Sequence, residues 1–357
     1  MASALGLSVR NALQTPAHRI SLVGGSRLNR SQISRNICQG AVRLHEQNHG
    51  INGVLPKFMH DTSHPLSVAD RVEKIAAILP ARPDSIQIAQ MAAHAHDVII
   101  DVIDDSNGAD PMAMYKRARG ARPDDMPAKM DGNEARSARW LNDRMTKAEV
   151  YSQAQIDTAV WAIDATYPGV ELGPDFKGKP FTSYDYYEAA ITQNPELGRL
   201  IVSLQAQGID RGPLFFQPHV ENPLEKGTDV PREVLWVALS DLGAAGMAEF
   251  AEFANEGDGE FREIYYNLWK TIKGIAEGED AESRRKISEK ILGWLSTQPG
   301  FATWQALRFE KIIHHLRKQN AISDVEDAGL RKLFSHYLTN IEATVRRADE
   351  AKKAYEK

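Results

Sequence analysis

The sequence contains a single cysteine, Cys38, among its 357 residues. An internal disulfide is therefore excluded, and a reducing compartment such as the cytoplasm is favoured. No run of about 18 uncharged apolar residues is present, so we expect no membrane span. Basic residues are not in excess, because 43 Lys and Arg stand against 48 Asp and Glu. This balance gives no strong sign of nucleic-acid binding.

Acidic residues are absent from the start of the chain, where the first is Glu46, whereas six arginines occur by Arg43. This composition is typical of a basic, disordered arm, and we assign residues 1–50 to such an arm. It is equally the composition of an organellar transit peptide. Targeting to an organelle therefore stays open beside the cytoplasmic expectation.

Strand-like alternation is missing beyond about residue 50, and helical spacing takes its place. Val68, Val72, Ile75 and Leu79 recur at intervals of three and four, which predicts an amphipathic helix ending at Pro80. The segment "DSIQIAQMAAHAHDVIIDVI" predicts a more deeply buried helix over residues 84–103. The sequence thus predicts an all-α protein, in which residues 51–256 form one helical domain and residues 257–357 a helical C-terminal extension. Two irregular stretches, 106–131 and 168–230, are expected to be insertions in that domain.

Polar residues with metal-binding chemistry interrupt the apolar helices. His96 and Asp97 lie side by side in the segment 84–103, where burial is costly unless something pairs with them. If that helix continues, Asp97, Asp101 and either Asp104 or Asp105 share one of its faces. Such close carboxylates repel one another unless a cation lies between them.

Two further positions point to the same chemistry. "MHDTSH" places His60 and His64 four residues apart just before the preceding helix, and Asp241 is a lone acid in the apolar segment "LWVALSDLGAAGM". Imidazole and carboxylate ligands together suit Mn, Fe, Ni, Co or Zn, and Mg when oxygen ligands dominate. We therefore expect a site for a divalent metal ion.

The order His64, His96-Asp97, Asp241 resembles the H…HD…D signature of the HD-domain metal-dependent phosphohydrolases. "NEARSARWL" is similar to the Asn-Glu-x-x-Ser-Ala helix of that family, and "AVWAIDAT" and "SDLGAAG" resemble two helices that close its site. The resemblance covers roughly residues 55–250. It implies an HD-domain helical bundle in which one divalent metal ion is held by four ligands: His64, His96, Asp97 and Asp241.

The resemblance also implies hydrolysis of a small phosphorylated substrate, such as a nucleotide, by metal-activated water. Asp101 is the candidate for orienting or deprotonating that water, and Glu134 could share this role or hydrogen-bond a ligand histidine. His60 resembles the histidine that protonates the leaving oxygen in the phosphodiesterase branch. The candidates for contacting phosphate oxygens are basic side chains, namely Arg136, Arg139, Lys116, Arg117 and Arg119.

The chain departs from the family pattern after the doublet, where Ile100 and Asp101 occupy the place of a second metal-ligating histidine. This difference favours one metal ion over two. A long gap precedes Asp241, which leaves Asp164 and Asp210 as substitutes for it. Two other functions stay open: a non-catalytic HD-fold regulator that binds a nucleotide or a protein, and a di-iron HD-type oxygenase. The sequence does not decide whether the protein is a homo-oligomer.

Overall fold

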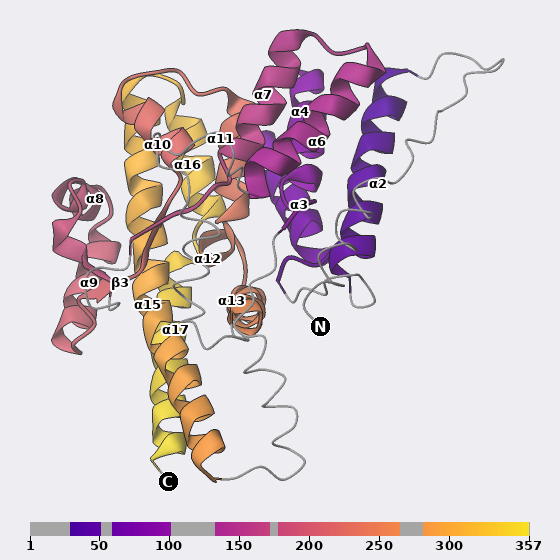
Figure 1. Ribbon diagram of the computed structural model, residues 1–357. Coiled ribbons are helices and arrows are strands. Elements are labelled where there is room, and N and C mark those ends of the chain that lie inside the picture. Colours follow the sequence, from indigo (N-terminus) through magenta and orange to yellow (C-terminus); the bar gives the residue numbers. More distant parts are fainter. Residues whose placement is uncertain (1–28, 51–58, 101–132, 172–177, 265–280, 357) are drawn as a thin grey trace.

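The computed structural model describes residues 29–50, 59–100, 133–171, 178–264 and 281–356 (Figure 1). Within them the chain is almost entirely helical, as the sequence predicted, with a few strands of two or three residues. No helix in these ranges is long and apolar enough to cross a membrane.

A helical bundle is built around α4 (Pro83–Ala95). Five helices pack against α4: α2 (Arg30–His49), α3 (Ser63–Ile78), α6 (Asn133–Ala148), α7 (Gln153–Asp164) and α11 (Arg232–Asp241). The central helix can be so closely surrounded because Ala89, Ala92 and Ala93 keep its sides narrow and are fully buried. The expected core positions Val68, Val72, Ile75 and Leu79 are fully buried as well.

The helix α2 corrects the expectation of a disordered arm over residues 1–50. Residues 1–28 lie outside the described residues, but Arg30–His49 form five turns of helix with Asn29 and Gln32 in a reciprocal capping box. Ile37 and Ala41 are buried against the bundle. The basic composition therefore belongs in part to the exposed face of a packed helix.

Two apolar segments that carry site residues form shorter helices than their length suggested. The helix α4 stops at Ala95 and not near residue 103, so Asp97 lies in a turn beyond its end. The expectation that Asp97 and Asp101 share a helix face is therefore wrong. The apolar segment around Asp241 is divided between α11 and the short α12 (Ala244–Met247), which α13 (Phe250–Ile264) follows, and Asp241 is the last residue of α11.

The expected insertion 168–230 is more regular than its Pro and Gly content suggested. Its helices are α8 (Tyr187–Gln193), α9 (Pro195–Ala206) and α10 (Pro218–Glu225), beside the short 3₁₀ helix η1 (Phe181–Ser183). Strand β1 (Gly169–Glu171) pairs antiparallel with β4 (Leu214–Phe216), and β2 (Lys179–Pro180) pairs with β3 (Arg211–Gly212). The other expected insertion, 106–131, lies outside the described residues.

The C-terminal helices join the same core as the bundle. The helix α15 (Ala281–Lys318) packs along α17 (Tyr337–Tyr355), and the two project together beyond the bundle (Figure 1). The helix α16 (Asp324–Leu333) packs on α3. Trp304 of α15 is fully buried in the hydrophobic cluster that includes the bundle helices. The described residues of the expected extension, 257–264 and 281–356, are therefore an integral part of the fold.

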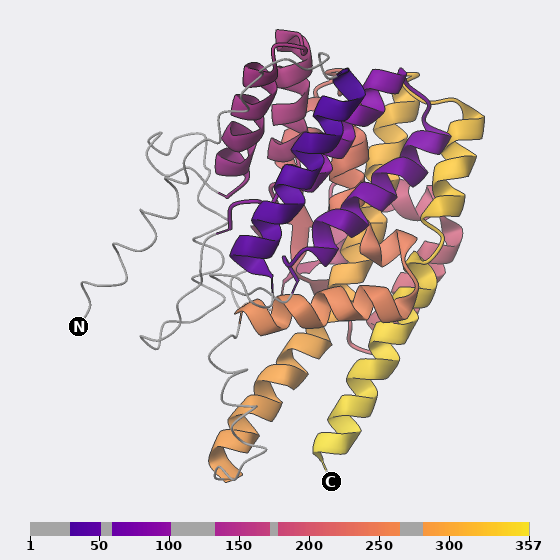
Figure 2. The ribbon, with the colours of Figure 1, turned by 90° about the vertical axis from the view of Figure 1, so that its right-hand side faces the viewer.

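The helix α13 crosses beneath the bundle, close to the start of α3 (Figure 2). Its side chains Glu252 and Glu256 pair with Arg71 of α3, where Glu252 lies 2.7 Å from the guanidinium. This contact ties the start of α13 to the middle of α3, and Glu263 near the end of α13 bonds His60, just before the start of α3.

Candidate metal centre

Four side chains from three parts of the bundle meet at one point. His64 lies in the first turn of α3, His96 and Asp97 directly follow α4, and Asp241 ends α11. His64, His96 and Asp97 are buried, and the Asp241 side chain is 12% exposed. His64 and Asp241 are thus helical residues at the end of α3 and of α11, and the packing of these ends on the turn after α4 brings the four side chains into one space.

The donor atoms of these four residues are close together. His64 Nε2 lies 3.2 Å from His96 Nε2, 3.5 Å from Asp97 Oδ2 and 3.3 Å from Asp241 Oδ1. His96 Nε2 lies 2.9 Å from Asp97 Oδ2 and 3.4 Å from Asp241 Oδ1. We name this group, His64, His96, Asp97 and Asp241, the ligand cluster.

These separations fit a bound metal ion. Ligand atoms about 2.1 Å from an ion lie about 3.0 Å apart along an octahedral edge and about 3.4 Å apart in a tetrahedron. The Nδ1 atom of His96 is 2.8 Å from the carbonyl oxygen of Ala93. Since a carbonyl only accepts, Nδ1 donates its hydrogen there, and Nε2 remains the atom available to a metal. The buried groups of this cluster can therefore hold a metal ion.

The charges within the cluster act strongly on one another. Burial favours the neutral form of His96, but the carboxylates of Asp97 and Asp241 outweigh it and raise the histidine pKa well above its usual value. Burial likewise opposes ionisation of Asp97, yet His96, His60 and His64 together hold its pKa well below the ordinary range. In the metal-free cluster the imidazole of His96 thus holds a proton, and a metal ion must displace this proton to bind.

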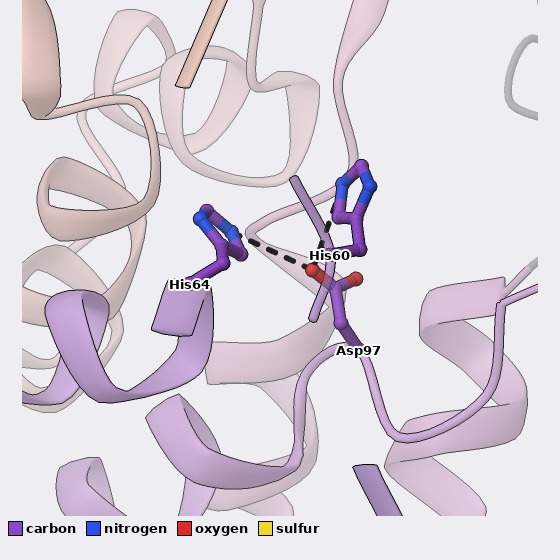
Figure 3. A group of neighbouring side chains, drawn as sticks. All are labelled: His60, His64 and Asp97. Atoms are coloured by element: carbon purple, nitrogen blue, oxygen red, sulfur yellow. Dashed lines mark ion pairs between the residues drawn. The ribbon is translucent and has the colours of Figure 1, made fainter. Parts of the chain in front are cut away.

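His60 lies beside the ligand cluster, and Asp97 connects the two. Figure 3 shows the Asp97 carboxylate between the rings of His60 and His64, with Oδ2 lying 3.8 Å from His60 Nε2. The other ring nitrogen, Nδ1, is 2.7 Å from Glu263 Oε2 of α13. Glu263 Oε1 also accepts from the backbone N–H groups of Met59 and His60, at 2.7 and 2.8 Å. One carboxylate therefore fixes both the turn and the ring of His60.

The other predicted site residues do not all reach the cluster. Glu134 is buried in the first turn of α6, but it belongs to none of the metal-ligating groups of the described residues. Arg136 is partly buried on the same helix, and Arg139 is exposed. The catalytic candidate Asp101 and the phosphate candidates Lys116, Arg117 and Arg119 lie outside the described residues.

The helix α6 nevertheless lies against the doublet. The backbone N–H of Ile99 donates to Ser137 Oγ at 3.2 Å, so the "NEARSARWL" helix holds the segment that follows Asp97. Asp241 is the distant acid of the cluster, and neither Asp164 nor Asp210 joins a metal-ligating group of the described residues. Asp210 is instead exposed, next to Arg211.

Sequence reasoning missed the contribution of α13. Glu260 and Glu263 both approach His60, and Glu260 Oε2 lies 3.9 Å from His60 Nδ1. A signal was present, because Glu252, Glu256, Glu260 and Glu263 follow one another at intervals of four, four and three along one helix face.

Helix α2 also brings buried histidines near the site. His45 and His49 are buried with ring centroids 5.8 Å apart, and the charges of Asp97 and His96 act on His45. Asn48 donates to the carbonyl of Val98 at 3.5 Å, which places this end of α2 beside the doublet.

Comparisons with protein-family models, with curated proteins and with solved structures gave no match for this chain. The site is therefore interpreted from its own residues and from the motif order of the sequence.

Proposed function

We propose that the protein is a metal-dependent phosphohydrolase that cleaves a small phosphate ester, such as a nucleotide. The observation that carries this proposal is the convergence of His64, His96, Asp97 and Asp241, whose donor atoms lie 2.9–3.5 Å apart. These are the four residues that the HD-domain resemblance implies as ligands, in the order of that signature.

The ligand cluster suits one divalent ion with mixed nitrogen and oxygen ligands, which favours Mn, Fe, Ni, Co or Zn over Mg. Such an ion, when bound, lowers the pKa of a bound water and polarises a phosphoryl oxygen. Asp97 and Asp241 supply the negative charge that attracts the ion, and the two imidazoles complete its ligand set. Asp101 remains our candidate for orienting the attacking water.

His60 is our candidate for the group that protonates the leaving oxygen. Because its Nδ1 donates to Glu263, its Nε2 is directed toward Asp97 and the edge of the ligand cluster. A proton on Nε2 would therefore be presented to a substrate held beside the cluster. We propose that Arg136 and Arg139 and the basic residues of the segment 106–131 meet phosphate oxygens on the substrate.

Hydrolysis of a broad panel of nucleotides and phosphate esters, assayed in Mn²⁺, tests the proposal. We expect wild type to release product, Asp97→Ala to release none, and Asp70→Asn to behave as wild type. Asp70 is the matched control because it lies on α3 near His64 in sequence but is exposed in a surface pair with Lys74. A wild-type protein loaded with metal that turns over no phosphate ester would overturn the proposal, and would favour the regulator or the oxygenase instead.

A further inference from the structure

A second group of metal-ligating side chains lies on the far side of the His60 ring from the ligand cluster. It consists of His60, Glu260 and Glu263, whose ligand atoms all lie within 4.8 Å of one another. None of the three belongs to the set that the H…HD…D motif supplies. We name them the α13 group, after the helix that carries both glutamates.

The carboxylate of Glu260 is poorly satisfied in its surroundings. Both of its oxygens are buried, and neither accepts a hydrogen bond within the described part of the chain. Among the described residues, Glu260 forms an ion pair with His60, in which Glu260 Oε2 lies 3.9 Å from His60 Nδ1. Burying a carboxylate without hydrogen bonds is costly unless a positive charge lies next to it.

One proton on His60 cannot satisfy both glutamates. The Nδ1 atom lies 2.7 Å from Glu263 Oε2, so its single hydrogen is directed there and away from Glu260. A cation between the three ligand atoms would contact Nδ1 and both carboxylates at once. The metal-free contact between His60 and Glu263 is then the arrangement that the cation replaces.

The same helix shows how a different pair of glutamates is neutralised. Glu252 and Glu256, two turns earlier, receive the guanidinium of Arg71. Arginine stays charged at every physiological pH. Asp97, Asp241 and Glu260, in contrast, form ion pairs only with histidines among the described residues. A single divalent ion in the ligand cluster balances Asp97 and Asp241 and leaves Glu260 without a permanent positive charge.

We propose that the α13 group binds a second divalent cation, separate from the ion of the ligand cluster. Octahedral ligand atoms about 2.1 Å from an ion are about 3.0 Å apart along an edge and about 4.2 Å apart across the ion. The distances of 2.7 and 3.9 Å from His60 Nδ1 are close to these values. One nitrogen and two carboxylate ligands suit Mn²⁺, Fe²⁺ or Zn²⁺.

This site would change the state of the His60 ring. With Nδ1 bound to a cation, the ring hydrogen must be on Nε2, the atom that faces Asp97. His60 then links the two sites and presents an N–H group to the ligand cluster.

The number of ions per chain tests this inference without reference to turnover. Purified full-length protein is loaded with Mn²⁺, freed of excess ion by gel filtration and measured by mass spectrometry of the metal. We expect two Mn²⁺ per wild-type chain and one per chain of Glu260→Gln. The matched control Glu256→Gln, one turn away and paired with Arg71, is expected to keep two.

Two outcomes would overturn the inference: one ion in wild type, or two ions in Glu260→Gln. Circular dichroism checks that Glu260→Gln is folded, and Glu263→Gln provides a second variant expected to hold a single ion. The result is independent of the phosphohydrolase proposal. Two ions without hydrolysis would leave this site standing, whereas hydrolysis with a single ion would overturn only the second site.

Discussion

The ligand cluster and a buried polar cluster around Arg308 differ in the source of their positive charge. In the C-terminal half, Arg308 of α15 reaches Glu221 of α10 at 2.6 Å and also contacts Gln217 and Gln305. Arg308 and Glu221 are each 4% exposed in their side chains. This arginine cluster is complete in itself, because the guanidinium charge is built into the chain.

The ligand cluster of the bundle around α4 has a similar degree of burial, but its positive partners among the described residues are only imidazoles. Imidazole protons, unlike a guanidinium charge, can be displaced by a metal ion, so the charge balance of this cluster depends on the ions in solution. A buried network that carries its own arginine stabilises a fold, whereas one that lacks a permanent cation can bind one. The comparison therefore distinguishes a network with a built-in charge from one that can hold a metal ion.

Asp241→Asn should produce the largest effect, and mainly on function. The variant removes a ligand and a charge, so we expect loss of the cluster ion and a fall in turnover of about 10³-fold or more, because the metal supplies several kcal/mol of transition-state stabilisation. The free energy of unfolding of the metal-free protein should also fall, because the ion pairs of Asp241 with His64 and His96 are lost. Metal analysis, turnover and urea unfolding measure these effects. A variant that keeps its ion would show that Asp241 is not a ligand.

Arg308→Met should mainly lower the stability of the fold and leave metal binding unchanged. Removing the guanidinium leaves the buried Glu221 with the ammonium of Lys311 at 3.7 Å and the backbone N–H of Gln217, and we expect a loss of about 3 kcal/mol in the free energy of unfolding. The metal content of the folded protein should stay as in wild type. As a control, Arg317→Met removes a half-exposed arginine that pairs with Asp324 and Asp327, and should cost about 1 kcal/mol or less. Equal losses in the two variants would refute the distinction.

His45 offers a test through the pH dependence of stability. Burial lowers its pKa to about 3 in the folded protein, whereas the unfolded chain binds the proton near pH 6.5. Stability must therefore fall as the pH drops below about 6.5, because the unfolded state takes up a proton that the folded state does not. Between pH 7 and pH 5 we expect metal-free wild type to lose about 2 kcal/mol more than His45→Leu.

Urea unfolding of the metal-free proteins at the two pH values measures this difference. His336→Gln is the control, since His336 is 32% exposed at the start of α17 and should leave the wild-type pH dependence in place. Identical pH dependence in wild type and His45→Leu would contradict the assignment of His45 as a neutral buried histidine.

Metal affinity should also depend on pH. Asp97 and Asp241 raise the pKa of His96 in spite of burial, so the metal-free cluster holds a proton that binding must release. If binding displaces one proton, the dissociation constant for Mn²⁺ should rise about tenfold when the pH falls by one unit. This change weakens the binding free energy by about 1.4 kcal/mol. Titration of the metal at pH 6, 7 and 8 measures the slope. The arginine cluster should show no such dependence, and a flat metal titration would argue against a protonated His96.

Helical periodicity predicted much of the fold, including α3, α6 and α7 and the buried character of α4. It could not show that α4 ends at Ala95, because Val98, Ile99 and Ile100 continue the apolar pattern beyond the turn. The polar helix α2 was missed for the opposite reason. Much of its buried face is made of small and imidazole side chains, including Ala41 and His45, which do not form an apolar stripe.

The four residues of the ligand cluster stand in a recognisable order along the chain, and the structure brings their donor atoms together. The role of α13 could not be predicted in the same way. Acidic residues at helical spacing usually mark a solvated surface, and only the packing of α13 across the start of α3 turns Glu260 and Glu263 toward His60. Sequence periodicity shows which residues share a helix face. It does not show which part of the protein that face packs against, because tertiary structure determines this.

The residues that meet in the ligand cluster are far apart along the chain, with His64 and Asp241 separated by 177 positions. The site therefore exists only after α3, α4 and α11 have packed together, and an ion cannot find its full ligand set earlier. Metal binding should accordingly be a late event in folding. A bound ion should stabilise the packing of α3, α4 and α11 in the folded bundle. Slower unfolding of the metal-loaded protein would then reflect the late formation of the site as well as its affinity for the ion.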